Sequence, residues 1–286
     1  LNIANCDSGE GDMLKKLAIT LSIILGAGSF AQACPGGLRA FNKQLDGKNT
    51  CVLEGTYVGD VTLESSFNYI LLGAVYIGSE KRDSSLQLTE PLQPGKLTVN
   101  AGVSIFALNP SKDRTGVWAG FTDENGNAVQ GDIKSFLSVT RDSQIIVKGS
   151  ASAPVLMSSA QGMHEATPSF EKRPGDWGGL VISGKAKSNK CNTFAGCTLP
   201  GEANTGFYGG DDDEHNAGSL QYLQVEYGGD RIDDEKELNG ITFNAVGLGT
   251  IIENVAVLYN ADDCIEFFGG TATGRNVFCY KGEDDG

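Results

Sequence analysis

The sequence is poor in histidine and in basic residues. Its two histidines, His164 and His215, are too few for a histidine-rich zinc site. The 22 lysines and arginines are outnumbered by 36 aspartates and glutamates, which gives a net charge of −14. A surface of this charge repels nucleic acid and anionic lipid, so we expect neither as a partner. The acidic surplus favours solubility and divalent cations instead.

Motifs for several common chemistries are also missing. The many glycines stand at turns without the following helix that a phosphate-binding loop requires. No serine-nucleophile motif is present, and no convincing amphipathic helix follows the N-terminal region. The sequence therefore contains no catalytic constellation strong enough to name a reaction.

The N-terminal region has the features of an export signal. Met13–Lys16 is a basic segment, Leu17–Ala27 is apolar, and Ala31–Ala33 supplies a cleavage site with small residues. The apolar stretch falls short of the roughly 20 residues that cross a bilayer, so we expect no transmembrane span in the mature chain. We interpret residues 1–12 as an upstream extension and residues 13–33 as a signal peptide.

Export sets the expected location. We expect the protein at the outer membrane surface or outside the cell, with the periplasm as the alternative. Cleavage after Ala33 leaves Cys34 at the mature N-terminus, which keeps a lipoprotein open as an alternative. Against it, Ala31 stands where a lipoprotein signal usually carries leucine, so ordinary cleavage is the favoured interpretation.

Six cysteines remain after the signal peptide, and an even number in an exported chain indicates disulfides. The candidate pairs are Cys34–Cys51, Cys191–Cys197 and Cys264–Cys279. In the repeat described next, Cys279 takes an inward position whereas Cys264 follows an acidic turn. The two side chains would then face different ways, and a partner beyond Gly286 is the alternative for Cys264.

A chemical pattern recurs after 22 residues near the end of the sequence. Asn254–Val255 returns as Asn276–Val277, and Asp262–Asp263 returns as Asp284–Asp285. A short strand and an acidic turn repeated at one spacing predict a solenoid, in which each coil buries its apolar face against its neighbours.

Short β segments divided by glycine, asparagine and aspartate fill the chain from Cys51 onward. The candidate strands before residue 150 are Val52–Tyr57, Val61–Leu63, Asn68–Ile77, Lys96–Val99, Gly102–Leu108, Phe136–Thr140 and Gln144–Gly149. Apolar residues alternate at Ile241 and Phe243 and at Val255 and Val257, which places one face inward. The turns lack the two-residue Asn-Gly hairpin signal, which favours parallel coils over a meander, with a sandwich as the alternative.

We expect residues 34–286 to form a single all-β domain, with N-terminal strands and a cap over 34–100 and coils over 101–286. Gly286 interrupts the repeat just after the second acidic turn, where a further strand is due. Because a solenoid needs a terminal cap with a polar outer face, we expect truncation at the C-terminus. A naturally short protein is the alternative.

Four segments carry a family resemblance: Gly175–Ala186 (GDWGGLVISGKA), Gly218–Gly229 (GSLQYLQVEYGG), Glu237–Thr250 (ELNGITFNAVGLGT) and Asn254–Thr271 (NVAVLYNADDCIEFFGGT). In this order they resemble a family of exported bacterial proteins, often labelled as lipoproteins or hypothetical surface proteins. The resemblance covers most of Cys51–Gly286. It implies a right-handed parallel β-helix at the envelope or outside the cell, and no reaction. One departure is Cys264, where the family usually has glycine.

The acidic turns are the strongest functional candidates. One coil apart, Asp262–Asp263 and Asp284–Asp285 would lie roughly 4.8 Å from each other. Two carboxylates at that spacing repel by about 1 kcal/mol even in water, so they favour full solvation or a bound cation such as Ca²⁺. The alternative is that they are solvated turn residues. A second acidic run, Asp211–Glu214, is expected to be a mobile loop.

An enzyme is the rival interpretation. Asp262–Ile265 resembles locally the Asp-Asp-Cys segment of polygalacturonase-type hydrolases, and paired carboxylates suit glycoside hydrolysis. Asp262, Asp263, Asp284 and Asp285 are the candidate catalytic residues. A lyase would add Ca²⁺ and a basic residue, for which Arg231 and Arg275 are candidates, although surface charges are the simpler interpretation.

Aromatic residues offer a further possibility. Candidates for a sugar-stacking platform are Trp118, Trp177, Tyr208, Tyr222 and Tyr227, although core packing is the favoured interpretation for Trp177. Tyr259 and Tyr280, nearly one coil apart, are expected to form a ladder. His215 is expected at the surface.

The favoured function is therefore non-enzymatic: an exported scaffold that binds glycans or cations, or supports adhesion to polysaccharide or cell-envelope components. The alternative is a β-helix lyase or glycoside hydrolase acting on acidic polysaccharide.

Overall fold

The computed structural model describes residues 33–41, 44–114, 118, 120–123, 125–162, 172–233 and 236–284. The expected extension and signal peptide before residue 33, together with His164 and Asp285, lie outside the described residues. The described chain contains strands and three short 3₁₀ turns, η1 (Pro35–Gly37), η2 (Pro110–Lys112) and η4 (Glu202–Asn204). No helix in this part of the chain is long and apolar enough to cross a membrane.

The chain visits three parallel faces in turn, and we call these faces A, B and C. Face A comprises the first parts of β2 (Asn49–Tyr57) and β4 (Phe67–Ile77), then β6 (Ser104–Leu108), β9 (Val155–Ser159) and the second parts of β13 (Gly218–Glu226), β17 (Ile251–Leu258) and β19 (Gly274–Tyr280). Face B comprises the ends of β2 and β4, then β7 (Phe136–Val139), β10 (Leu180–Ser183), β16 (Ile241–Asn244) and β18 (Ile265–Phe268). Face C comprises β3 (Gly59–Leu63), β5 (Gly95–Asn100), β8 (Gln144–Lys148) and the first parts of β13, β17 and β19.

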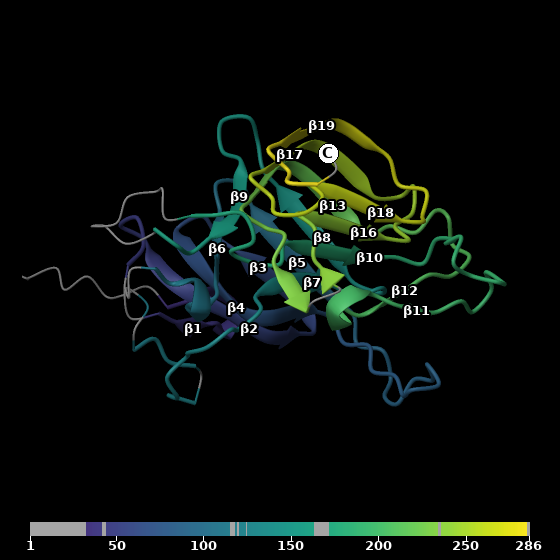
Figure 1. Ribbon diagram of the computed structural model, residues 1–286, viewed down its shortest axis with the longest axis horizontal. Coiled ribbons are helices and arrows are strands. Elements are labelled where there is room, and N and C mark those ends of the chain that lie inside the picture. The colour runs from purple at the N-terminus through teal and green to yellow at the C-terminus, as the bar shows by residue number, and fades with distance from the viewer. Residues whose placement is uncertain are drawn as a thin grey trace, which may run out of the picture. The chain divides into compact units, whose positions relative to one another are not determined.

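Every pairing within the three faces is parallel, and Figure 1 shows β10, β16 and β18 stacked side by side. The architecture is therefore the predicted parallel β-helix and not a sandwich. Each strand of one coil bonds to the strand at the same position of the next, which satisfies its backbone groups and gives each face its flat column of side chains.

The 22-residue repeat corresponds to one coil. Val255 in β17 pairs with Val277 in β19, and Val257 pairs with Cys279. Earlier coils are longer because insertions leave at their corners. For example, Ser104 in β6 pairs with Leu156 in β9 of the next coil, so this coil is much longer than 22 residues. The repeat is consequently visible in the sequence only at the end of the chain.

One apolar core runs through the inside of the coils. Ile241, Phe243, Val255 and Val257 are buried in it, as their alternation predicts. Trp177 is the largest of the fully buried side chains. The interior thus supplies the hydrophobic free energy that stabilises a stack of otherwise polar-edged coils.

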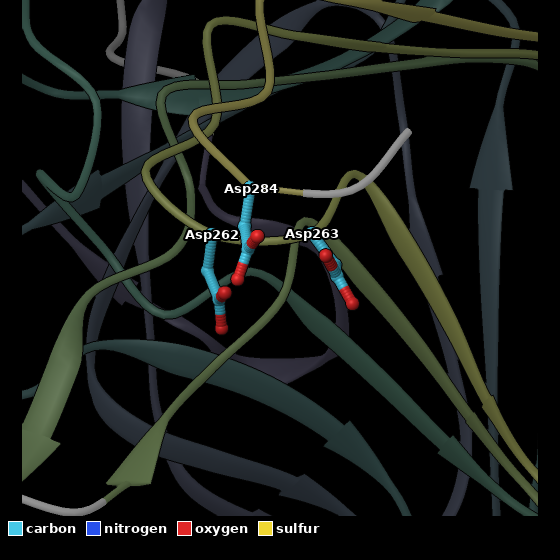
Figure 2. A group of neighbouring side chains, drawn as sticks. All are labelled: Asp262, Asp263 and Asp284. Carbon is cyan, nitrogen blue, oxygen red and sulfur yellow. The ribbon is translucent and has the colours of Figure 1, made fainter.

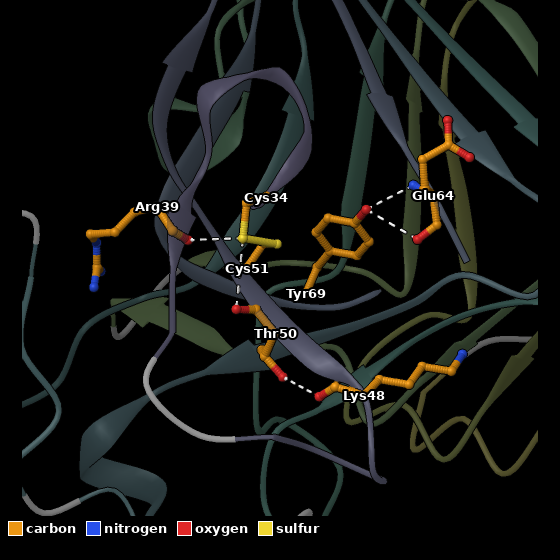
Figure 3. Close-up of a disulfide and its surroundings, with 7 residues drawn as sticks. All are labelled: Cys34, Arg39, Lys48, Thr50, Cys51, Glu64 and Tyr69. Atoms are coloured by element: carbon orange, nitrogen blue, oxygen red, sulfur yellow. Dashed lines mark hydrogen bonds between the residues drawn. A yellow bond between two sulfur atoms is a disulfide. The ribbon is translucent and has the colours of Figure 1, made fainter. Parts of the chain in front are cut away.

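Tyr69 places a polar group inside the coils, and this group is hydrogen-bonded to the backbone. The Tyr69 hydroxyl accepts a hydrogen bond from Glu64 N at 2.7 Å and donates one to Glu64 O at 3.2 Å, as Figure 3 shows. Burial raises the pKa of Tyr69 to about 12, so the hydroxyl keeps its proton at neutral pH.

Insertions cover the outer surfaces of two faces. Leu45, Trp118 and Phe121 form a second apolar cluster with the outer side chains of face A. Over face B, a third cluster includes Ala203 and Ile232. These two residues belong to segments with short antiparallel pairs: β11 (Leu199–Pro200) with β12 (Phe207–Tyr208), and β14 (Arg231–Asp233) with β15 (Lys236–Glu237). The N-terminal strand β1 (Arg39–Ala40) runs antiparallel to β2.

All three disulfides form in the pairs named from the sequence: Cys34–Cys51, shown in Figure 3, Cys191–Cys197 and Cys264–Cys279. The alternative that Cys264 faces away from Cys279 is wrong. Their Cα atoms lie 5.8 Å apart, because the turn carrying Cys264 brings its side chain back to the buried interior. In this state the Cys34 sulfur is bonded to Cys51 and cannot carry a lipid thioether.

Candidate functional site

The turns that lead from face A to face B meet at one corner of the β-helix, which we call the acidic corner. Hydrogen bonds join each turn to the next: Asp176 N donates to Tyr227 O, Ala261 N donates to Gly228 O, and Glu283 N donates to Asn260 O. The turns follow one another closely, since a Cβ on Gly229 would lie 2.7 Å from Ala261 N. Stacked turns bring residues together that are far apart in the sequence.

The two upper turns carry the predicted site. Asp262, Asp263 and Asp284 each offer a carboxylate oxygen, and these atoms all lie within 4.8 Å of one another. Figure 2 shows the side chains of Asp262 and Asp284 pointing the same way from adjacent turns, with Asp263 next along the chain. The structure thus brings together three of the four predicted residues, and Asp285 lies outside the described part. We call the three the acidic group.

Asn260 holds the backbone of the turn that carries Asp262 and Asp263. Asn260 is fully buried, and its Nδ2 donates to the carbonyl oxygens of Asp262 at 3.0 Å and Asp263 at 2.7 Å. This amide therefore holds the backbone of the turn and takes up none of the carboxylate oxygens.

The surroundings of Asp262 disfavour its charged state. Burial raises the pKa of Asp262, and the nearby carboxylates of Glu237, Asp263 and Asp284 add to this effect. The pKa of Glu266 on β18 is also raised, by burial first and then by surrounding carboxylates that include Asp262 and Asp263. A cation placed among these groups would reverse the shift, because it stabilises the ionised carboxylates.

The lower turns of the same corner carry their own counter-charges. The carboxylate of Asp230 is 2% exposed and lies 3.3 Å from Lys112 Nζ and 3.2 Å from Lys134 Nζ. The equally buried Asp176 accepts from Arg114 at 2.9 Å. All three basic residues belong to the insertion between β6 and β7, which therefore neutralises the buried carboxylates, as burial of charge requires.

The acidic group differs from these lower turns. Within the described ranges, Asp262 and Asp284 form no salt bridge. Sequence reasoning did not identify Asp176 and Asp230 as members of the same corner. The available signal was weak: each follows a glycine in a turn-like segment, as GD in GDWGG and in YGGD.

The two arginines considered as basic residues of a lyase each form a salt bridge with a glutamate. Arg231 forms a salt bridge with Glu237, and Arg275 lies 2.7 Å from Glu253 across β17 and β19. Both arginine side chains are mostly exposed. Their interpretation as surface charges is confirmed.

Two expectations around the second acidic run need correction. Asp213 accepts from Lys187 Nζ at 2.6 Å, and its carbonyl oxygen accepts from Leu248 N and Thr271 Oγ1, so the run is bonded to neighbouring coils. His215 is not at the surface: its side chain is buried where this segment packs against the next coil at Gly247. Burial, and then the charge of Lys185, lowers the pKa of His215.

The proposed aromatic platform does not form, because Trp118, Trp177 and Tyr208 are buried. The predicted ladder does form: the Tyr259 and Tyr280 rings lie 5.7 Å apart, edge to face. It also extends downward to Tyr227, whose ring is stacked on Tyr259 at 5.2 Å.

These features define the protein as a parallel β-helix with acidic turns stacked at one corner. The family model for the pectate-lyase-like β-helix domain matches residues 55–286, and the chain belongs to that family. Comparison with curated proteins gives no match, and neither does comparison with solved structures. Three disulfides agree with a location outside the cytoplasm.

Proposed function

We propose that the protein is an exported, surface-displayed β-helix scaffold that binds Ca²⁺ at the acidic group and glycans or other envelope components on its faces. The observation that carries the cation proposal is the contrast within the acidic corner. Asp176 and Asp230 have arginine and lysine partners, whereas Asp262 and Asp284 form no salt bridge within the described ranges. Carboxylate oxygens of these two residues and of Asp263 nevertheless lie within 4.8 Å of one another.

Calcium suits this group better than other metals. The three residues supply only carboxylate oxygens, which are the ligands of hard cations, and Ca²⁺ accepts them in loose geometry. Because Asp262 and Asp284 come from successive coils, a bound ion would also cross-link the two turns. Binding would thereby stabilise the folded chain.

Calorimetric titration with CaCl₂ after chelator treatment tests the proposal, together with thermal melting. We expect saturable binding and a higher Tm, since a site filled at 100 times its Kd adds about 2.7 kcal/mol to the free energy of unfolding. The double variant Asp262→Asn/Asp284→Asn should lose both effects. Asp211→Asn, in the other acidic run, is the matched control and should keep them. An unchanged Tm with no binding heat would refute cation binding.

Cleavage of acidic polysaccharide is the second candidate, favoured by the family's pectate-lyase-like description and by the paired carboxylates. Against it, Arg231 and Arg275 are held by glutamates. Incubation with a panel of acidic polysaccharides, followed by assay of reducing ends and of unsaturated products, separates the two functions. We expect neither product. Products that disappear in Asp263→Asn would instead establish an enzyme.

A further inference from the structure

A cavity of about 520 Å³ lies over the first coils of face B. Its walls come from four separate segments: the end of β2, the end of β4 with the loop after it, the turn after β7, and the β11–β12 region. Its volume falls within the roughly 300–1,000 Å³ typical of small-molecule sites. No sequence motif marks it, because its residues meet only when the coils stack.

The lining combines hydroxyl groups with aromatic rings. Thr56 and Thr89 are exposed and Ser79 is half-buried, and none of their hydroxyls bonds to another described residue. Tyr76 and Phe207 supply the rings. Hydroxyls both donate and accept, as sugar hydroxyls do, while rings cover the apolar face of a pyranose.

The two rings are held in place before any ligand arrives. The Tyr76 hydroxyl donates to Asn204 O at 2.9 Å, and its ring meets Phe136 edge to face at 5.7 Å. The Arg82 guanidinium lies 5.7 Å from the centre of the Phe207 ring. A site with fixed rings loses little conformational entropy on binding.

The walls are joined by a buried ion pair. The Glu80 side chain is 2% exposed and accepts from Arg141 NH2 at 2.5 Å. Arg141 NH1 in turn donates to Gly209 O at 3.1 Å, beyond the β11–β12 pair. The loop after β4 and the β11–β12 region are thereby tied to the same residue.

Charges at the cavity are already used within the protein. Arg82 Nε donates to Glu80 at 2.6 Å and its NH1 to Leu86 O, and Lys81 lies 3.1 Å from Glu90. A carboxylated sugar is best recognised by a free guanidinium fork, and here both nearby guanidinium groups are turned onto Glu80 and backbone carbonyls. The net charge of −14 further disfavours an acidic polysaccharide.

We propose that this cavity binds an uncharged pyranose unit of a polysaccharide. The inference rests on the glycan-binding part of the proposed function and assigns it a place and a sugar class. It is independent of Ca²⁺ at the acidic corner.

Calorimetric titration of the intact exported chain with cellohexaose, xylohexaose, mannohexaose and hexagalacturonate tests the proposal. We expect at least one uncharged hexamer to bind and hexagalacturonate to bind more weakly. Phe207→Ala should weaken that binding about tenfold, and Thr89→Val about threefold, because one loses the ring and the other a single hydroxyl. Phe194→Ala removes an exposed ring outside this cavity and should leave the affinity unchanged.

The other outcomes are equally informative. Stronger binding of hexagalacturonate would overturn the sugar class. Full affinity in both Phe207→Ala and Thr89→Val would place glycan binding elsewhere and leave the proposed function standing. Binding of none of the four hexamers would overturn the inference, while the calcium titration would still decide the cation site separately.

Discussion

Cys264 and Cys279 join the turn of one coil to the strand of the next. Cys264 directly follows Asp263, and Cys279 lies opposite Val257 in the parallel pairing of β17 and β19. The disulfide therefore fastens the turn that carries Asp262 and Asp263 to the coil that carries Asp284. It restricts how far the members of the acidic group can move apart.

Removing this disulfide should weaken both the fold and the cation site. For Cys264→Ala/Cys279→Ala we expect the free energy of unfolding in urea to fall by about 3 kcal/mol, from the loop of 15 residues. Calcium affinity should also fall, because Asp262 and Asp284 are held less closely. Cys191→Ala/Cys197→Ala is the matched control: its shorter loop predicts about 2 kcal/mol, with Ca²⁺ affinity unchanged. Equal Ca²⁺ affinity in both double variants would contradict this coupling.

The acidic group should make stability depend on pH in a defined direction. The raised pKa of Asp262 means that the folded state holds the proton more tightly than the unfolded state. Its stabilising contribution is therefore complete below the unfolded pKa and is lost as the pH rises through the folded pKa. In chelator at neutral pH, Asp262→Asn should consequently melt above the unmodified protein. It should also show a flatter dependence of Tm on pH.

Calcium should reverse this dependence, since the ion needs ionised carboxylates. The rise of Tm on adding CaCl₂ should be largest at neutral pH and shrink as the pH falls through the raised pKa of Asp262. Melting curves from about pH 3 to 8, with chelator or with CaCl₂, measure both effects. A Ca²⁺ effect of constant size across this range would count against ligation by Asp262.

Local patterns in the sequence were sufficient for the strands and for the acidic turns. The alternation around Val255 and Val257 reports burial directly, and the 22-residue spacing equals one coil. The first signal depends on neighbouring residues only, and the second on two adjacent coils without an insertion between them. For this reason they survive in a single sequence, and they also place Asp262 beneath Asp284.

Contacts between distant segments could not be predicted. Lys134 neutralises Asp230 from 96 residues away, so the charge balance of the acidic corner is invisible locally. His215 and Trp118 are buried because insertions of variable length fold back over the coils, and their own neighbours give no sign of it. The cavity over face B is hidden for the same reason.

Trp177 should be among the most sensitive positions of the core. It is 1% exposed, and its Nε1 donates to Glu226 O at 2.7 Å. We expect Trp177→Ala to lower the free energy of unfolding by about 3–5 kcal/mol. Trp177→Phe should cost less, because it keeps most of the volume but leaves the carbonyl of Glu226 without its donor.

Phe278→Ala is the control for Trp177, since this aromatic side chain is 56% exposed and should cost within about 0.5 kcal/mol. Urea denaturation followed by circular dichroism reports all three variants without relying on tryptophan fluorescence. Similar losses in Trp177→Ala and Phe278→Ala would show that Trp177 contributes no more than a surface ring.

Gly218 should tolerate no side chain, because the backbone of the adjacent strand β8 comes too close to its Cα. It begins β13 with φ of +116°, and a Cβ there would lie 1.9 Å from Ile145 O in the adjacent strand β8. Backbone atoms cannot move aside as a flexible side chain can, so Gly218→Ala must separate β8 from β13 on face C. We expect a loss of more than about 4 kcal/mol, seen as a collapse of soluble yield or of Tm. Gly126→Ala isolates the cost of the left-handed backbone alone: its φ is +80° with no atom within 4 Å of the new Cβ, and it should lose about 1–2 kcal/mol. If both variants fold with the same Tm, the close approach of these strands is not what requires glycine at position 218.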